Sequence, residues 1–223
     1  MDGYASYPKI WRETGANMMG EKIPVANPSK TYPDSTTLLA SLLRNSPKSV
    51  DILAIGSMTN IAAVITAEPK LKSKIRRIIS MGGAVNTPGN LRVHGFTDNH
   101  TNTKAEWNYY IDPVATKIVF DSGVPITLVP LDATNKVPLT KGFVENLKGP
   151  SPKPLEAFAL RVFENITKST TNGEYFHWDP LTAAVARNPK LCDKTERMNL
   201  TIIADPGKDT GLSNGQSPDL FPF

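Results

Sequence analysis

A carboxylate and a carboxamide stand two residues apart at Glu106 and Asn108. Residues 106–111 are predicted to be extended, and residues two apart on an extended segment point to the same face. A carboxylate beside an amide suits the recognition of hydroxyl groups and the stabilisation of a developing positive charge. The alternative is an exposed edge strand that carries two polar residues and binds nothing. Both interpretations fit the local pattern.

A second candidate carboxylate, Asp179, stands directly before Pro180. An Asp-Pro pair is a common helix start, with the aspartate as N-cap. A helix start that faces a cleft can also present its carboxylate to a cation. The single cysteine, Cys192, excludes an internal disulfide, and three histidines without a close grouping argue against zinc. Any bound metal should therefore be a hard cation held by oxygen atoms.

These side chains need a scaffold, and the chain alternates short apolar runs with helical patterns. Buried strands are predicted at 50–55, 75–81, 125–129 and 198–204, and helices from 35, from 60, over 112–123, near 140–148 and 154–169, and from 179. This alternation predicts an α/β fold, a mostly parallel sheet with helices on both faces. Residues 1–34, which are rich in proline and glycine, are predicted to be loop.

Ligands of parallel sheets bind beyond the carboxyl ends of the strands. The polar residues that follow Ile55, Met81 and Val129 are therefore candidates for a site. The irregular stretch 84–104 is long for a loop in a compact domain, and such loops are usually functional or disordered. Asp132 is expected to hold loop backbone rather than ligand.

The composition fits one α/β domain over residues 1–223, with 39% hydrophobic and 21% charged residues. The net charge of +4 is spread along the chain, so nucleic acid is not an expected partner. No apolar run approaches the roughly 20 residues that span a bilayer, so no membrane segment is expected. The sequence assigns no compartment, although the cytoplasm is slightly favoured over secretion.

Taken in order, five segments between residues 50 and 190 resemble the inosine-uridine-type nucleoside hydrolase family. They are Ile55-Gly56-Ser57-Met58-Thr59-Asn60-Ile61-Ala62, Met81-Gly82-Gly83-Ala84, Glu106-Trp107-Asn108 with Ile111-Asp112-Pro113 behind it, Pro130-Leu131-Asp132-Ala133-Thr134, and His177-Trp178-Asp179-Pro180. The resemblance implies a Rossmann-like nucleoside hydrolase fold, cleavage of the N-glycosidic bond of a ribonucleoside, Ca²⁺ as cofactor and a homo-oligomeric full-length form. It also shifts the balance at residues 106 and 108 towards a ligand site.

The resemblance implies ribose-binding roles for Glu106 and Asn108, and sugar contacts for Met81 and Asn90. Asn102 is an alternative to Asn90, because this chain carries extra residues between Asn90 and Glu106 compared with short-loop members. A plain core methionine is the alternative at Met81.

The matching calcium ligands are the carboxylate of Asp179 and the main-chain carbonyl of Ile55. A hydrophobic side chain at residue 55 is no objection, since the backbone oxygen binds. For Asp179 the N-cap interpretation remains the alternative.

Trp178 resembles the purine-preferring branch, in which an aromatic ring stacks on the base and helps it depart. His177 is a candidate general acid for the leaving base, although a sequence neighbour does not automatically face the same cleft. Trp11 resembles part of the first flexible active-site loop and is a candidate second stacking partner. A tryptophan packed on the surface is the alternative there.

The family opens with a strand that ends in an aspartate cluster, which supplies the catalytic base and most calcium ligands. The early acids here, Asp2, Glu13 and Glu21, lack that spacing. We therefore expect an N-terminally truncated member, with the first strand or strands and a C-terminal segment absent and activity impaired. The alternatives are an inactive nucleoside-binding homologue and an unrelated α/β protein.

Overall fold

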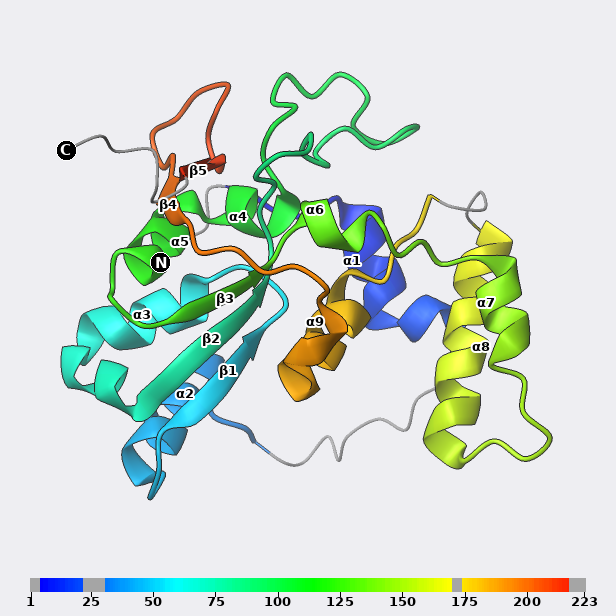
Figure 1. Cartoon of the computed structure of the whole chain (residues 1–223), viewed down its shortest axis with the longest axis horizontal. Coiled ribbons are helices and arrows are strands. Elements are labelled where there is room, and N and C mark those ends of the chain that lie inside the picture. Colours follow the sequence, from blue (N-terminus) through cyan, green and yellow to red (C-terminus); the bar gives the residue numbers. More distant parts are fainter. Residues whose placement is uncertain (1–4, 22–30, 170–173, 217–223) are drawn as a thin grey trace. The chain divides into compact units, whose positions relative to one another are not determined.

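A computed structural model describes residues 5–21, 31–169 and 174–216 (Figure 1). The chain divides into two compact units. Unit 1 comprises residues 1–6, 33–133 and 178–223, and unit 2 comprises residues 7–32 and 134–177. A single domain over residues 1–223 stays a prediction.

Unit 1 is built on a three-stranded parallel sheet in the order β1-β2-β3. The strands are β1 (Val50–Ala54), β2 (Ile75–Met81) and β3 (Ile126–Val129). Met81 lies beside Val129 in the register, so β2 and β3 end at the same level. The segments that follow them therefore start from one edge of the sheet, as the sequence predicted.

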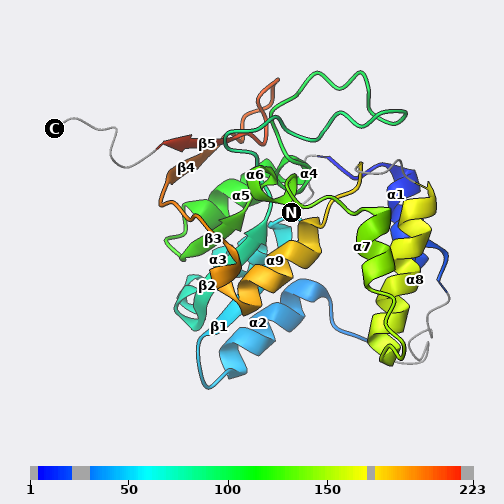
Figure 2. The same cartoon turned by 45° about the vertical axis from the view of Figure 1, so that its right-hand side comes forward.

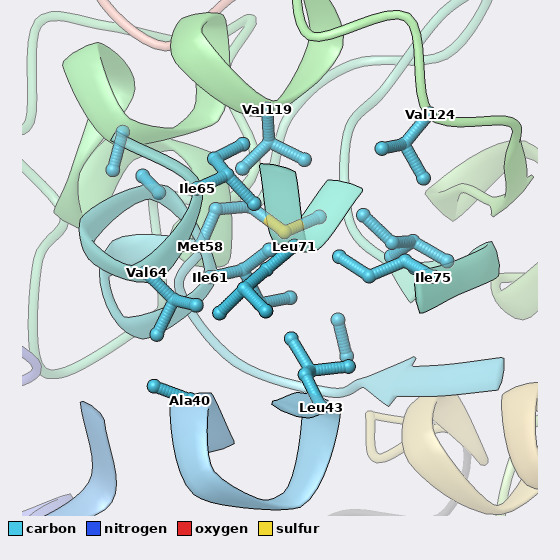
Figure 3. Close-up of a cluster of buried hydrophobic side chains, with 14 of the residues drawn as sticks. Ala40, Leu43, Met58, Ile61, Val64, Ile65, Leu71, Ile75, Val119 and Val124 are labelled. Carbon is cyan, nitrogen blue, oxygen red and sulfur yellow. The ribbon is translucent and has the colours of Figure 1, made fainter. Parts of the chain in front are cut away.

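Helices cover both faces of this sheet. Ile78 packs into a core with residues of α2 (Ser35–Asn45), α3 (Thr59–Ala67) and α5 (Pro113–Phe120), part of which Figure 3 shows. Ile79, the next residue, points to the opposite face and packs against α9 (Trp178–Arg187). The predicted α/β architecture is confirmed.

Unit 1 also holds a separate antiparallel pair, β4 (Asn199–Ile202) and β5 (Ser213–Gln216). The predicted strand at 198–204 is therefore present, but it pairs outside the parallel sheet. Shorter elements are the 3₁₀ helices η2 (Pro69–Lys74) and η3 (Pro189–Leu191), and the helices α4 (Trp107–Ile111) and α6 (Leu131–Thr134).

Two sequence-based assignments are wrong. Residues 107–111 form helix α4 rather than an extended segment, because the Glu106 carboxylate caps the helix start. Residues 1–34 are not all loop, since they contain α1 (Lys9–Ala16) and η1 (Met18–Gly20). Pro8 stands just before α1, where proline is compatible with a helix start. Asp2 and residues 22–30 of the predicted loop lie outside the described residues.

Unit 2 contains α7 (Lys141–Asn146) and α8 (Pro154–Ser169), close to the predicted ranges and packed side by side (Figure 2). Its core gathers Leu139, Val144 and Ile166, with Phe163 partly buried against them. Among the described residues of both units, the helices are too short or too polar to cross a membrane.

Candidate active site at the end of strand β2

Glu106 is a buried carboxylate that holds the first turn of α4 against the end of β2. Its Oε1 accepts a hydrogen bond from the backbone N–H of Asn108 (2.9 Å). Its Oε2 accepts from Gly83 (3.1 Å) and Tyr109 (3.3 Å). The side chain therefore joins the Gly82-Gly83 turn to α4 through backbone donors alone.

The electrostatics of Glu106 place a second carboxylate nearby. Burial raises the pKa of Glu106 to about 7, although the three N–H donors act to lower it. The charge of Asp179 raises the pKa further. The two carboxyl groups, 73 positions apart in the sequence, therefore lie within electrostatic reach of each other.

Asn108 connects the same helix to Met81, the last residue of β2. Its Nδ2 donates to the backbone oxygen of Met81 (3.1 Å) and approaches the sulfur (3.3 Å). Met81 is 2% exposed and packs in a small cluster with Leu131 and the partly buried Trp178. Glu106, Asn108, Met81, Trp178 and Asp179 are thus brought together at the carboxyl end of β2.

The two positions after Met81 must be glycine, because the Tyr109 ring packs closely against the backbone there. A Cβ at Gly82 would lie 2.3 Å from the Tyr109 ring, and Gly83 has φ +75°. The Tyr109 hydroxyl pairs with Ser80 Oγ at 3.0 Å. The sequence pattern indicated the glycines but not this aromatic partner, which comes from α4.

The two candidate amides, Asn90 and Asn102, have different surroundings. Asn90 Oδ1 accepts from the N–H of Trp107 (3.0 Å), at the start of α4. Asn102 is buried within the loop, where Oδ1 accepts from Lys104 and Ala105 and Nδ2 donates to Thr210 (2.8 Å). Asn102 therefore stabilises loop backbone, whereas Asn90 contacts the helix that carries Asn108.

The loop 84–104 is fixed at its base. Asp132 accepts hydrogen bonds from the N–H groups of Val85 (2.9 Å) and Asn86 (2.7 Å), which confirms its predicted role. Ser213 Oγ accepts from Ala84 N–H and donates to Ala84 O, both at 3.0 Å. Ser213 gave no sequence signal, since it lies 129 positions away.

Asp179 lies inside the first turn of α9, which begins at Trp178. Among the described residues its carboxylate takes part in no hydrogen bond or ion pair, so the N-cap interpretation is not what the geometry shows. Burial raises its pKa to about 6. A half-buried carboxylate without a counter-charge suits a cation.

The chemistry of these donors fits calcium. The Asp179 carboxylate and the Ile55 carbonyl, just past the end of β1, are hard oxygen donors. They are two of the roughly six to eight ligands that Ca²⁺ takes. Within the described ranges, no three His, Cys, Asp or Glu side chains gather as a metal-binding group.

His177 and Trp11 belong to unit 2, and their roles stay predictions. The His177 ring packs against Phe143 and Phe163, with ring centroids 4.4 and 5.5 Å away. Its Nε2 is buried without a hydrogen bond among the described residues, and burial lowers the pKa of the imidazole. Trp11 is half-buried on α1.

Comparison with known proteins gives the same family as the motifs. The profile of a family described as inosine-uridine preferring nucleoside hydrolase matches residues 4–218. Nucleoside hydrolase 3 of Arabidopsis thaliana is 33% identical over 204 residues, which cover 75% of this chain and 23% of that protein. A pyrimidine-specific ribonucleoside hydrolase, RihA of Klebsiella pneumoniae, is 33% identical over 72% of this chain and 49% of its own length. The chain thus spans half or less of these relatives.

Solved structures share the fold. The inosine-uridine preferring nucleoside hydrolase of Bacillus anthracis superposes with a TM-score of 0.77 at 26% identity, covering 98% of this chain and 70% of that one. The purine-preferring ribonucleoside hydrolase of Gardnerella vaginalis gives 0.68 at 26% identity, covering 91% and 62%.

Proposed function

The chain belongs to the inosine-uridine preferring nucleoside hydrolase family, and on that premise we propose that it forms the sugar- and base-binding part of a nucleoside hydrolase site. The reaction is hydrolysis of a ribonucleoside to ribose and free base. The observation that carries the proposal is the convergence of Glu106, Asn108 and Asp179 at the carboxyl end of β2. These residues come from α4 and α9, which only the fold brings together.

The proposed roles follow from the chemistry of each group. Glycosidic cleavage passes through an oxocarbenium-like state, in which positive charge develops on the sugar ring. Two carboxyl groups within electrostatic reach of each other favour that charge. With its pKa near 7, Glu106 binds a sugar hydroxyl in either form, as an acceptor when ionised and as a donor when protonated. Asn108 adds a second contact to the sugar through its amide, and Met81 and Asn90 add further sugar contacts.

We propose that the Asp179 carboxylate and the Ile55 carbonyl hold part of a calcium site. A bound Ca²⁺ would bind sugar hydroxyls and acidify a water molecule. Because two donors are only a fraction of a full ligand shell, we expect the 223 residues alone to bind the ion weakly and to turn over slowly.

The proposed substrate preference is for purine nucleosides. Trp178 supports it, because a partly buried indole packed beside Met81 is suited to stacking on a large aromatic base. The names of the relatives include both pyrimidine-specific and purine-preferring enzymes. The preference therefore rests on Trp178 alone.

The deciding experiment is base release from inosine by the full-length protein in millimolar calcium, compared with its Glu106→Ala and Asn108→Ala variants and the control Asp98→Ala. Asp98 is exposed on the loop and bonds locally to Gly95 N–H. We expect both site variants to lose activity by orders of magnitude and the control to keep it. Because Glu106 also caps α4, circular dichroism must show that each variant is folded. Equal activity in all folded variants would refute the assignment.

A nucleoside-binding protein without hydrolysis is the second candidate, favoured by the small number of calcium donors. Saturable inosine binding with no base release, even at long incubation, would establish it. The same family resemblance leads us to propose that the whole protein is a homo-oligomer, which light scattering of the full-length form would test.

A further inference from the structure

Four successive backbone N–H groups after β2 each donate a hydrogen bond to a side chain from elsewhere in unit 1. They are those of Gly83, to Glu106; Ala84, to Ser213; and Val85 and Asn86, both to Asp132. Two of these three acceptors are carboxyl groups, whereas the third is the neutral hydroxyl of Ser213, the first residue of β5. The roles of Glu106 and Asp132 are accounted for above, and the role of Ser213 is not.

The Ser213 hydroxyl uses both of its hydrogen-bonding functions on one residue. Its Oγ accepts from the N–H of Ala84 and donates to the carbonyl oxygen of Ala84, both at 3.0 Å. Ser213 is 1% exposed and Ala84 is 2% exposed, so water does not readily replace either bond. The two bonds fix the peptide groups on both sides of Ala84.

The residue before Ala84 is the one that contacts Glu106. Gly83 has φ +75°, and a glycine pair is the most freely rotating backbone that a turn can have. The N–H of Gly83 donates to Glu106 Oε2 at 3.1 Å, and its carbonyl accepts from the N–H of Leu131 at 2.9 Å. Holding Ala84 therefore limits the rotation that would carry the Gly83 N–H away from the carboxylate.

The β4–β5 hairpin also contacts the helix on the other side of Glu106. A Cβ at Gly215, in β5, would lie 2.7 Å from Val85 Cγ1. A Cβ at Gly211, just before β5, would lie 2.8 Å from the Cα of Tyr110 in α4. The hairpin thus packs closely against both segments that the Glu106 carboxylate joins, so it can hold one in register with the other.

We propose that Ser213 is a positioning residue for sugar recognition. It holds Ala84, keeps the Gly83 N–H at the Glu106 carboxylate, and so fixes the orientation in which that carboxylate meets a sugar hydroxyl. The inference rests on the proposed function, and Ser213 itself touches no proposed ligand. Without the hydroxyl, the Gly83 peptide can rotate and Glu106 Oε2 loses one of its two backbone donors.

The hairpin offers a matched pair of variants. Ser213→Ala removes the hydroxyl that crosses to Ala84. Thr210→Val removes another fully buried hydroxyl of the same hairpin, whose bonds to the carbonyls of Asp205 (2.7 Å) and Gly207 (2.9 Å) stay within the connection between β4 and β5. Ser213→Cys keeps a side chain of similar shape with a much weaker donor and acceptor, so it tests the same two bonds if the alanine variant does not fold.

The measurement is kcat/KM for inosine with the full-length protein, in the unmodified background and in the Glu106→Ala background, each variant checked for folding by circular dichroism. We expect Ser213→Ala, and Ser213→Cys in the same direction, to lower kcat/KM by about ten- to hundredfold, the usual cost of misplacing a substrate-positioning group. Thr210→Val should stay within about twofold. In the Glu106→Ala background, Ser213→Ala should cost less than about threefold, because the carboxylate that it orients is gone.

The second background separates positioning from a general structural role. A residue that merely stabilises the hairpin would lower kcat/KM by the same factor with or without Glu106, and that result would overturn the inference. A loss in Ser213→Ala no larger than in Thr210→Val would overturn it as well, and the proposed function would stand. If Glu106→Ala itself keeps full activity, the proposed function fails and the role of Ser213 fails with it.

Discussion

At Glu106 a single side chain serves as helix cap and as candidate sugar ligand. Its two oxygens take three backbone donors and leave the carboxyl with a pKa near 7. An isolated buried carboxylate would be far more costly, and the N–H groups offset part of that cost. The cap therefore keeps a titratable group available inside the site.

The pH dependence of stability follows from this raised pKa. An ordinary glutamate titrates near 4.5, so between about pH 4.5 and pH 7 Glu106 is protonated when folded and ionised when unfolded. Unfolding then releases a proton. The contribution of Glu106 to the free energy of unfolding is therefore complete below about pH 4.5 and is lost as the pH rises through about 7. We expect the melting temperature in EDTA to fall over this interval and to fall less in Glu106→Gln. Asp179, whose pKa is raised to about 6, acts in the same direction.

The control for this titration is Asp98→Asn, which changes an exposed carboxylate. A parallel pH profile for Glu106→Gln and the unmodified chain would contradict the expectation.

Trp178 allows a test of stacking at a single residue. Trp178→Phe keeps an aromatic face, whereas Trp178→Ala removes it and leaves a gap beside Met81 and Leu131. If stacking helps the base depart, Phe should retain most of kcat/KM for inosine and Ala should lose about tenfold or more. The kcat/KM for uridine should change less in both variants, because its base is smaller. Equal losses in Phe and Ala, or equal effects on both nucleosides, would argue against stacking.

At this scale the sequence supplied the residue types but not their geometry. Carboxylate, amide and aromatic groups at 106, 108 and 178 are gathered in one region, but not through the extended segment predicted for 106–111. The error arose because a side chain that caps its own helix reverses a weak local preference. Likewise, Asn102 and Asn90 are equivalent in sequence, and only the contacts of Asn102 with Thr210 and Ala105 distinguish them.

Among the elements, the loop 84–104 depends on contacts at its base. Asp132 binds Val85 and Asn86 at the point where the loop leaves β2. We expect Asp132→Ala to cost about 1–3 kcal/mol and to speed tryptic cleavage at Arg92 several-fold, because a half-buried N–H group at Val85 and an exposed one at Asn86 lose their charged acceptor. Inosine affinity should weaken as well, since Asn90 lies on this loop.

Asp98→Ala is the matched control, because it removes a contact inside the loop and leaves its base intact. Cleavage at Arg92 that is equally fast in both variants would show that the base does not hold the loop.

The strands of the parallel sheet were predictable because continuous apolar runs have few alternatives in a compact domain. Helix α5 was predictable from its Asp-Pro start, and α8 from its length and periodicity. The strand β5 was not, since Ser213-Asn214-Gly215-Gln216 has no apolar alternation and depends on pairing with β4. Helix α1 was not predictable, because the prolines and glycines of residues 1–34 indicate loop.

For the whole molecule, every described donor of the proposed calcium site belongs to unit 1. Asp179 and Ile55 lie there, and none of α1, α7 and α8 of unit 2 contributes one. We expect calcium to slow amide exchange in α3, α4 and α9 and to leave α7 and α8 unchanged. Exchange mass spectrometry in calcium and in EDTA measures this directly. Protection in unit 2 of the same size as in unit 1 would place the ion elsewhere.

The neck of the 84–104 loop has a practical consequence. Gly89 N–H donates to Thr103 O (2.8 Å) and Asn90 N–H to Ala105 O (3.1 Å), while a Cβ at Gly89 would lie 2.1 Å from that same oxygen. These backbone hydrogen bonds hold the two sides of the loop together below its exposed tip around Phe96. A peptide tag or fluorescent reporter inserted at the tip would therefore be separated from the rest of unit 1 by these hydrogen bonds. We expect such an insertion to leave the residues before 89 and after 105 undisturbed.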